Sequence, residues 1–594
     1  MLTPLPTDDP GLPRRMADFA TLLDALDYAA RGIRGFNFYS ARGDLVDVLS
    51  FAELRERALI TARQLITAGL ERGCRVALIA DTTPDFIVAF FGCQYAGLLP
   101  VPLPLPTSFG GKDGYVEQLG KQMTSCHAAA AIAPTGMSEL LAQATEGLEM
   151  ALVMTSEELA TLPEGNPELR PQARNDICYL QYSSGSTRFP HGVAVTQASV
   201  MSNCHGNGVH GIEVRDGDRM MSWLPFYHDM GLVGAMLTLV AVQVTADYLP
   251  TEFFARRPLL WLELISRNKA TVTYSPTFGY ELCARRVKPE QVAELDLRSW
   301  RVAGLGAEMI RADSMREFSR TFAPAGFNDK AFLSSYGLAE CTLAVSFMPL
   351  ERGIEVDVVD ESLLSLEHRA VAPTSDKAKI REVVNCGIPM PEYDIVIRDE
   401  NGDSLSDRGV GQIYVRGPSV MSGYFNDPEG TRNVLDEAGW LDTGDMGYMV
   451  GRSLYIVGRA KDLIILNGRN HWPQDIEWTV EQIEGLRSGD SAAISVPGRD
   501  NEEVAMILVQ PRVSELEERR KLVGEVKRRV QKEVGIACRV AMVKPRSLPR
   551  TSSGKLSRVK ARANYMSGLL EPLEGSDPYP WEDAAPLKAA AAGE

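Results

Sequence analysis

Apolar residues recur at helical spacing through residues 50–73, SFAELRERALITARQLITAGLERG, which begin with a serine able to cap a helix. The apolar run RVALIA follows at 75–80 and predicts a strand, and TPDFIVAFFGCQYAGL at 83–98 predicts another helix. VPLPLP at 101–106 reads as a buried extended segment, and AAAAIAP at 128–134 as a further short strand. This alternation of helix and strand predicts an α/β fold with parallel strands.

The pattern changes near residue 459. Residues 458–483, GRAKDLIILNGRNHWPQDIEWTVEQI, predict a turn, a strand, a polar loop and then a helix that opens a new unit. An apolar stripe at helical spacing follows, formed by Leu516, Leu522, Val523, Val526, Val530 and Val534, and it predicts a helix lying on a small sheet. We therefore place a domain boundary after residue 458, and predict that the Ala-rich end, 581–594, is disordered.

Length and composition favour a soluble protein of several domains. The 594 residues exceed what one hydrophobic core usually organises. Hydrophobic residues make up 45% of the chain, and no apolar run approaches the roughly 20 residues that cross a bilayer. The N-terminus, MLTPLPTDDPGLPRR, has acids and prolines where a secretory signal has a basic and then an apolar region. We expect a cytoplasmic protein with no transmembrane segment.

Cysteine, histidine and charge exclude several other classes. The nine cysteines form no CxxC pair and the seven histidines no HExxH motif, so neither a disulfide framework nor a zinc site is indicated. A formal charge of -16 argues against nucleic acid as a partner, because phosphate backbones require a basic surface. Residues 514–562 nevertheless hold fifteen Lys or Arg against five Glu.

The candidate chemistry begins with YSSGSTRFPHGVAV at 182–195, a run of small and hydroxylated residues after the apolar strand ICYLQY. Backbone N–H groups of such a loop can approach phosphate oxygens closely, and the hydroxyls add donors. The candidate phosphate ligands are Ser183, Ser184, Gly185, Ser186 and Thr187. Taken alone, a loop of this composition is more often only a flexible turn.

Four further motifs follow in order: SYGLAE at 335–340, WLDTGD at 440–445, GRAKD at 458–462 and RTSSGKLSR at 550–558. With the loop, they resemble the phosphate, adenine and magnesium, ribose, hinge and catalytic-lysine motifs of the adenylate-forming superfamily, which includes acyl-CoA synthetases, luciferases and nonribosomal adenylation domains. The resemblance spans nearly all of residues 20–565. It implies a large N-terminal adenylation domain over 1–458, built from several subdomains with mixed and parallel sheets, and a small, mobile α+β lid domain over 459–580.

The resemblance assigns roles that suit the side chains, with ATP and Mg²⁺ as cofactors. Asp445 can accept from ribose hydroxyls, and Arg459 can donate to sugar or phosphate. Glu340 and Thr187 can hold Mg²⁺, which prefers oxygen ligands. Lys555 can place a point charge between the carboxylate and the α-phosphate in the transition state, and the lid would turn about Lys461. The remaining candidates for binding the nucleotide are Ser335, Tyr336, Gly337, Leu338, Ala339 and Ile456.

Three other stretches resemble fatty acyl-AMP ligases in particular: WLPFYHDMGL at 223–232, YSPTFGYELCARR at 274–286 and SWRVAGLGAE at 299–308. By this resemblance, His228 and Asp229 lie near the adenylate, with His228 counted among the catalytic residues. Gly306, Ala307 and Glu308 line the adenine side. The expected acyl tunnel is formed by Met230, Met236, Leu237, Tyr274, Pro276, Phe278 and Gly279. Ordinary core packing explains any one of these apolar residues equally well.

A long segment after SYGLAE, at about 351–384, resembles an insertion of fatty acyl-AMP ligases that hinders the lid rotation needed for coenzyme A. The implied function is ATP-dependent formation of an acyl-adenylate from a fatty acid, then transfer to the phosphopantetheine thiol of an acyl carrier protein or of a carrier domain in a polyketide or nonribosomal peptide synthase. Two alternatives stay open. One is a fatty acyl-CoA synthetase, and the other is a degenerate adenylate-binding protein with little turnover.

Two residues of the phosphate loop depart from the family pattern. Where the family has Gly and then Lys, this chain has Arg188 and His191. Arg188 replaces a residue free to adopt positive φ, although its guanidinium can bind phosphate. His191, with an ordinary pKa of about 6.5, is mostly neutral at pH 7 where Lys is charged. We expect weaker stabilisation of pyrophosphate.

Overall fold

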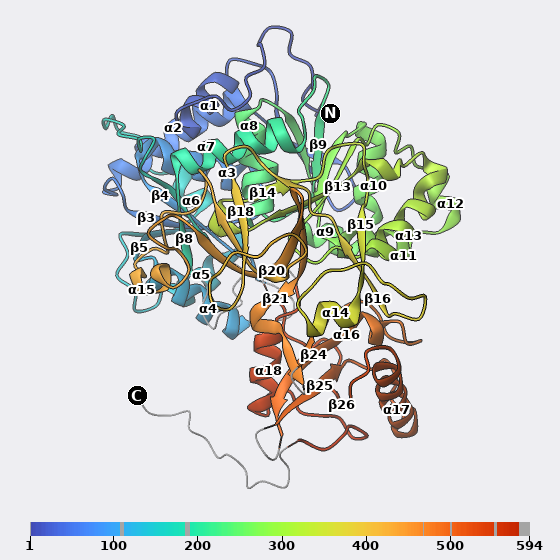
Figure 1. Cartoon of the computed structure of the whole chain (residues 1–594). Coiled ribbons are helices and arrows are strands. Elements are labelled where there is room, and N and C mark those ends of the chain that lie inside the picture. The colour runs from blue at the N-terminus through green and yellow to red at the C-terminus, as the bar shows by residue number, and fades with distance from the viewer. Residues whose placement is uncertain are drawn as a thin grey trace.

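The computed structural model describes residues 2–106, 112–183, 191–466, 469–498, 502–551 and 555–580. Figure 1 shows a large N-terminal part, coloured blue to yellow, and a smaller C-terminal part, coloured orange to red, that projects from one side of it. Among the described residues, no helix is both long and apolar enough to cross a membrane. The cytoplasmic location stays a prediction.

A nine-stranded sheet forms the centre of the N-terminal part. Its six inner strands, from β13 to β1 in spatial order, run parallel, and the pairs at both edges are antiparallel. The strands in spatial order are β17 (Ile388–Pro389), β14 (Ala344–Phe347), β13 (Phe332–Gly337), β12 (Val302–Leu305), β11 (Val272–Ser275), β9 (Arg219–Ser222), β10 (Thr245–Tyr248), β1 (Gly35–Tyr39) and β2 (Leu45–Ser50).

A second sheet of four parallel strands contains the first predicted elements. Its order is β4 (Leu99–Leu103), β3 (Arg75–Ile79), β5 (Ala128–Ala133) and β6 (Leu152–Thr155). The helices predicted before and after β3 are α2 (Phe51–Thr67) and α3 (Pro84–Ala96), and the Ser50 side chain accepts from the Glu53 amide as a helix cap. Every residue of α3 except Asp85 is buried, which explains why the rest of its sequence is apolar on every side.

Helices cover both large sheets, and one hydrophobic core joins residues from Ala17 to Leu454. These helices are α1 (Leu22–Ala29), α4 (Lys112–Ser125), α5 (Ser138–Thr145), α6 (Ser156–Ala160), α7 (Gln197–Gly206), α8 (Thr238–Ala241), α9 (Thr251–Arg256), α10 (Leu259–Asn268), α11 (Thr277–Arg286), α12 (Pro289–Val292) and α13 (Ala312–Phe322). Strands β7 (Ile177–Tyr182) and β8 (Gly192–Thr196) pair antiparallel, and the candidate phosphate loop lies between them in sequence.

The expected insertion folds into a hairpin and a short helix. Strands β15 (Val356–Asp360) and β16 (Ile380–Val384) pair antiparallel, and α14 (Glu361–Leu366) lies between them in sequence. Next come the four antiparallel strands β18 (Asp394–Arg398), β19 (Gly411–Arg416), β20 (Leu441–Val450) and β21 (Ser453–Arg459), with α15 (Pro428–Arg432) between β19 and β20. In Figure 1, α14 and β16 lie at the border with the C-terminal part.

The C-terminal part begins with a short 3-10 turn, η7 (Ala460–Asp462), and the hairpin of β22 (Ile464–Leu466) and β23 (Arg469–His471). Strand β23 occupies part of the predicted polar loop. A three-stranded sheet follows, with order β24 (Ser491–Pro497), β25 (Glu503–Val509) and β26 (Cys538–Met542), packed by α16 (Pro473–Glu481), α17 (Leu516–Glu533) and α18 (Arg558–Met566). Val523, Val526 and Val530 are buried, so the predicted apolar stripe of α17 is confirmed.

The fold class is confirmed as α/β, with a large N-terminal region of mixed and parallel sheets and a small α+β C-terminal region. The exact domain limits, 458 and 459, remain a prediction. The tail at 581–594 lies outside the described residues.

Candidate active site

The motifs meet at one edge of the nine-stranded sheet because they follow the carboxyl ends of neighbouring parallel strands. His228 lies beyond β9, Phe278 beyond β11, Glu308 beyond β12, and Tyr336 near the end of β13. In open α/β sheets, this edge is where ligands bind. Residues far apart in sequence therefore share one site.

Tyr336, Asp445 and Arg459 form a cluster on the predicted nucleotide side, in which Tyr336 and Asp445 are buried and Arg459 is half-exposed. The Tyr336 hydroxyl donates to Asp445 Oδ2 at 2.8 Å, and Arg459 Nε donates to Asp445 Oδ1 at 3.1 Å. Asp445 and Arg459 face each other in the β20–β21 register, so the backbone fixes the pair. Asp445 raises the pKa of Arg459. The Asp445 carboxylate accepts these two hydrogen bonds and still has lone pairs for two ribose hydroxyls.

Glu340 and His191 are joined through Tyr424. The Tyr424 hydroxyl donates to Glu340 Oε1 at 3.0 Å, and the His191 ring stacks on the Tyr424 ring with centroids 4.5 Å apart. His191 Nδ1 also lies 3.0 Å from Asp427 Oδ2. Burial raises the pKa of Glu340, which a nearby cation would lower again. One buried carboxylate, completed by phosphate oxygens, fits the way Mg²⁺ is usually held.

Lys555 reaches the site from the C-terminal part. Burial lowers the pKa of its ammonium group, and the carboxylates of Asp229 and Glu308 act in the opposite direction. Burial also raises the pKa of Asp229, but His228, at 2.6 Å from Asp229 Oδ1, and Lys555 more than offset this, so the pKa is lowered. The Asp229 carboxylate therefore interacts with both His228 and Lys555 at the junction of the two parts.

Glu308 caps the start of α11. Its Oε1 accepts from the Phe278 amide at 2.9 Å, a favourable place for a carboxylate at a helix N-terminus. Burial raises the pKa of Glu308 to about 6, although the Phe278 amide and Lys555 act against the rise. Ala307 has φ of 69°, so the backbone turns sharply just before Glu308. The loop after β12 thus links the nucleotide side to α11.

A large cavity of about 1910 Å³ runs through this region, with walls from both parts of the chain. Met230, Pro276 and Phe278 of the predicted acyl tunnel line it, as do the unpredicted Trp223, Phe254 and Leu282. The Trp223 and Phe254 rings stack with centroids 3.9 Å apart. This wall is apolar and rigid, as expected for a lipid chain.

The other four predicted tunnel residues do not line this cavity. Met236 and Leu237 are fully buried in the core. The Tyr274 ring packs on Gly304, and Gly279 lies against Ser275, Trp223 and Phe254, where a Cβ would clash. For these four residues the role in acyl binding remains a prediction, and core packing describes what the structure shows.

The remaining predicted residues are placed as follows. The Ser335 hydroxyl donates to the Leu305 carbonyl at 2.7 Å, and Gly306 lies opposite Ser335, where a Cβ would be 3.1 Å from Ser335 Oγ. Ser183 directly follows β7, and its amide donates to the His191 carbonyl at 3.1 Å. Gly337, Leu338 and Ile456 line the cavity, Ala339 begins a 3-10 turn, and Lys461 is exposed on η7. Ser184, Gly185, Ser186, Thr187 and Arg188 lie outside the described residues.

Sequence reasoning missed Tyr424, Asp427 and Phe254. Tyr424 and Asp427 lie in GYFNDPEG, a polar stretch without a pattern that would single them out. Phe254 belongs to a short helix outside every motif. Trp223 is the first residue of the motif WLPFYHDMGL and directly follows β9. Its place in that motif is the signal that could have identified it as a cavity residue.

Family models match both parts of the chain. Residues 39–425 match the AMP-binding enzyme family, and residues 468–562 match the AMP-binding enzyme C-terminal domain. The chain therefore belongs to the AMP-binding enzymes, the adenylate-forming superfamily. It is a ligase of this superfamily, and the resemblance to fatty acyl-AMP ligases is confirmed by the relatives described next.

Among similar proteins, a provisionally named acyl-CoA synthetase of Caulobacter vibrioides is 48% identical over 96% of this chain and 98% of its own length. A medium-chain-fatty-acid–[acyl-carrier-protein] ligase of Moorena producens is 32% identical over 94% of this chain and 97% of its own. A long-chain-fatty-acid–AMP ligase of Mycolicibacterium smegmatis is 31% identical over 92% of this chain and 93% of its own length.

A solved structure from studies of fatty acyl-adenylate ligases of E. coli and L. pneumophila also matches. Its TM-score is 0.90 at 46% identity, with 94% of this chain and all of the other covered. The similarity extends through both parts of the molecule, so the C-terminal region belongs to the fold that this class of enzyme shares.

Proposed function

We propose that this protein activates a fatty acid with ATP to form an acyl-adenylate, and then transfers the acyl group to the phosphopantetheine thiol of a carrier protein. The observation that carries the first step is the meeting of Lys555 with Asp229, Glu308 and the apolar cavity wall. The names of the Moorena and Mycolicibacterium relatives support the same substrate class.

In the proposed chemistry, the fatty acid carboxylate attacks the α-phosphorus of ATP and pyrophosphate leaves. Asp445 and Arg459 hold the ribose, and the aromatic wall of Trp223 and Phe254 holds the alkyl chain. Lys555 stabilises negative charge that develops between carboxylate and phosphate. Catalysis comes from positioning and charge, and no covalent protein nucleophile takes part.

Mg²⁺ would neutralise charge on the phosphates, with Glu340 as its protein ligand in the described residues. The Tyr424 hydroxyl would orient Glu340 toward it. Thr187 is proposed as a second ligand.

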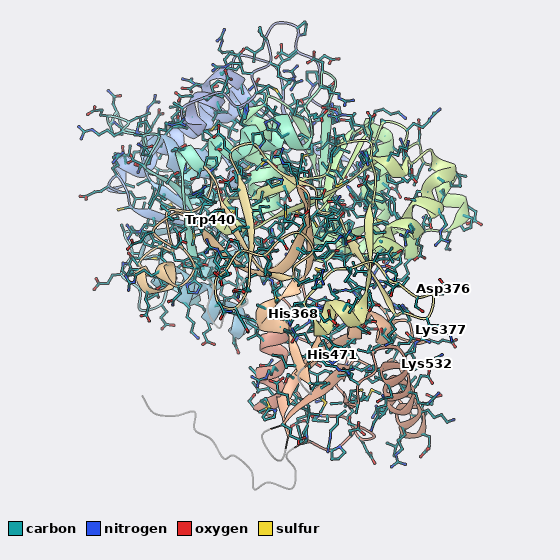
Figure 2. All side chains as sticks on the ribbon, viewed as in Figure 1. His368, Asp376, Lys377, Trp440, His471 and Lys532 are labelled. Carbon is teal, nitrogen blue, oxygen red and sulfur yellow. The ribbon has the colours of Figure 1, made fainter. Side chains whose placement is uncertain are left out.

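The choice of a carrier protein over coenzyme A is supported by contacts between the insertion and the C-terminal part. Lys379 Nζ donates to the Glu533 carbonyl, and the Asn470 side chain lies 3.3 Å from His368 Nε2. Figure 2 labels His368 and His471 where the insertion meets this part of the molecule. An insertion held in this way resists a rotation of the lid. A protein-bound arm brings additional docking energy that free coenzyme A lacks.

Pyrophosphate release with ATP, Mg²⁺ and fatty acids of graded length tests the first step. Release that depends on the fatty acid is expected. Radiolabelled acyl transfer is then measured with a phosphopantetheinylated carrier protein, with free coenzyme A and with neither. Transfer to the carrier protein alone supports the proposal, whereas no release with any acid would identify a degenerate adenylate-binding protein.

An acyl-CoA synthetase is the second candidate, favoured by the name of the Caulobacter relative. Combining His368→Ala with Lys379→Ala should permit transfer to coenzyme A if the insertion restrains the lid. Lys377→Ala is the matched control, because Lys377 is exposed in the same insertion. Efficient transfer to coenzyme A by the unaltered protein would identify it as an acyl-CoA synthetase.

A further inference from the structure

The segment that bears Lys555 is tied to helix α16 on both of its sides. Arg558, three residues after Lys555, donates from Nε to Glu477 Oε1 at 2.8 Å and from Nη2 to Glu477 Oε2 at 2.6 Å. Arg550, before Lys555, donates to the Gly489 carbonyl at 2.9 Å, and the Gly489 amide donates to a side-chain oxygen of α16, Glu481 Oε1, at 2.6 Å. The position of Lys555 therefore follows the position of α16.

Arg311 connects α16 to the N-terminal part. It precedes α13, and its side chain is only 14% exposed. Its guanidinium carbon lies 5.2 Å from the centre of the Trp478 ring, and its Nη1 lies 3.7 Å from Glu481 Oε2. Trp478 and Glu481 both belong to α16. One side chain from the N-terminal part thus contacts two residues of this helix.

Arg311 also lies three residues after Glu308, the carboxylate that faces Lys555 across the junction. A short chain of contacts consequently runs from the Glu308 loop through Arg311 and α16 to the segment of Lys555. A planar guanidinium can present its face to an indole and its N–H groups to a carboxylate together, which an ammonium cannot do.

We infer that Arg311 is a positioning residue for Lys555 in the adenylation step. The inference rests on the proposed function for what Lys555 does, and on the contacts above for where it lies. Arg311 touches neither ATP nor the fatty acid in this scheme. It holds the lid at the distance at which the ammonium group meets the reacting carboxylate and phosphate. A displacement of about 1 Å from such a position can cost up to about 100-fold in rate.

The kinetic test separates the two half-reactions in Arg311→Gln. The kcat of pyrophosphate release should fall about 10- to 100-fold with KM for ATP within about twofold, because ATP binding residues are untouched. Transfer from supplied acyl-adenylate to a carrier protein should stay within about twofold, since Lys555 acts only in the first step. Trp478→Leu should give the same pattern, and the double variant should be no worse than either single one.

The control variant is Arg320→Gln, an exposed side chain on α13, the helix that Arg311 precedes. It should leave both half-reactions unchanged. Arg311→Lys should behave like Arg311→Gln, because it keeps the charge but loses the planar contact. Equal losses in both half-reactions of Arg311→Gln, or additive losses in the double variant, would overturn the positioning role.

A second readout does not depend on activity. The rate at which an amine-reactive reagent modifies Lys555, followed by mass spectrometry, should rise several-fold in Arg311→Gln but not in Arg320→Gln. Unchanged labelling overturns the inference even if activity falls. If the unaltered protein shows no adenylation with any acid, the proposed function fails, yet the labelling comparison still decides whether Arg311 places Lys555.

Discussion

Glu481 should make the stability of the C-terminal region depend on pH. Its side chain is only 7% exposed and it accepts from the Gly489 amide. Burial, and then the neighbouring Glu477, raise its pKa from 4.5 to about 8, against the smaller opposing effects of the Gly489 amide and Arg311. The substitution that tests this is Glu481→Gln, which keeps an acceptor oxygen and removes the titration.

The magnitude follows from the difference between the two states. The unfolded chain releases this proton near pH 4.5, whereas the folded chain keeps it up to about pH 8. Between those values the folded state binds more protons, so the free energy of unfolding falls as pH rises. A difference of about 3.5 pH units corresponds to ~5 kcal/mol, and relaxation of the structure makes this an upper limit. The glutamine variant lacks this loss.

Urea denaturation followed by tryptophan fluorescence at pH 5 and at pH 8.5 measures the effect. The stability of the variant relative to the unaltered protein should be greater at pH 8.5 than at pH 5. Glu484→Gln is the control, because Glu484 is exposed three residues beyond the end of α16 in the following turn. An equal pH dependence in the unaltered protein and in Glu481→Gln would refute the assignment of a buried, protonated Glu481.

Three further substitutions test the site. Lys555→Ala should lower the rate of pyrophosphate release by about 100-fold or more, and near-normal turnover would remove Lys555 from the mechanism. His191→Lys should raise that rate about fivefold, since a permanent charge beside phosphate is worth ~1 kcal/mol when partly solvated. An unchanged rate would mean that having His191 in place of the family's Lys does not affect adenylation. Tyr336→Phe should raise KM for ATP about tenfold by removing a donor to Asp445, and an unaltered KM would contradict the ribose assignment.

The sequence predicts the central α/β elements well because their signals are local. Ser50 caps α2 as expected, and β3 and α3 follow within a residue or two of the predicted limits. Strand β23 falls in a segment that the sequence predicts as a loop, because residues 469–471, RNH, are polar and pair only through their backbone. Short strands of this kind have no periodicity to detect.

The candidate site shows the same division. Asp445, Arg459 and Lys555 stand in motifs, and the structure brings them together. Tyr424, by contrast, acts through a ring stacked on His191 and a hydroxyl on Glu340, both distant in sequence, so its place depends on tertiary packing alone. Met236 and Leu237 show a different difficulty, because both are predicted to line the acyl tunnel and both are fully buried in the core. An apolar residue near a motif has the same sequence pattern in either place.

The bond between Arg558 and Asp462 limits where the molecule can bend. Arg558 Nη1 donates to Asp462 Oδ2 at 2.9 Å, and the same guanidinium donates to Glu477. These bonds hold Asp462, α16 and α18 together, so they would move as one unit. If the C-terminal part turns between the two half-reactions, as proposed, its backbone angles must change ahead of Asp462, in the two residues Ala460 and Lys461 that follow Arg459. Arg459 is itself hydrogen-bonded to Asp445 of the N-terminal part, so it would not move with the C-terminal part. Such a rotation would therefore be confined to a hinge no longer than the short 3-10 turn η7.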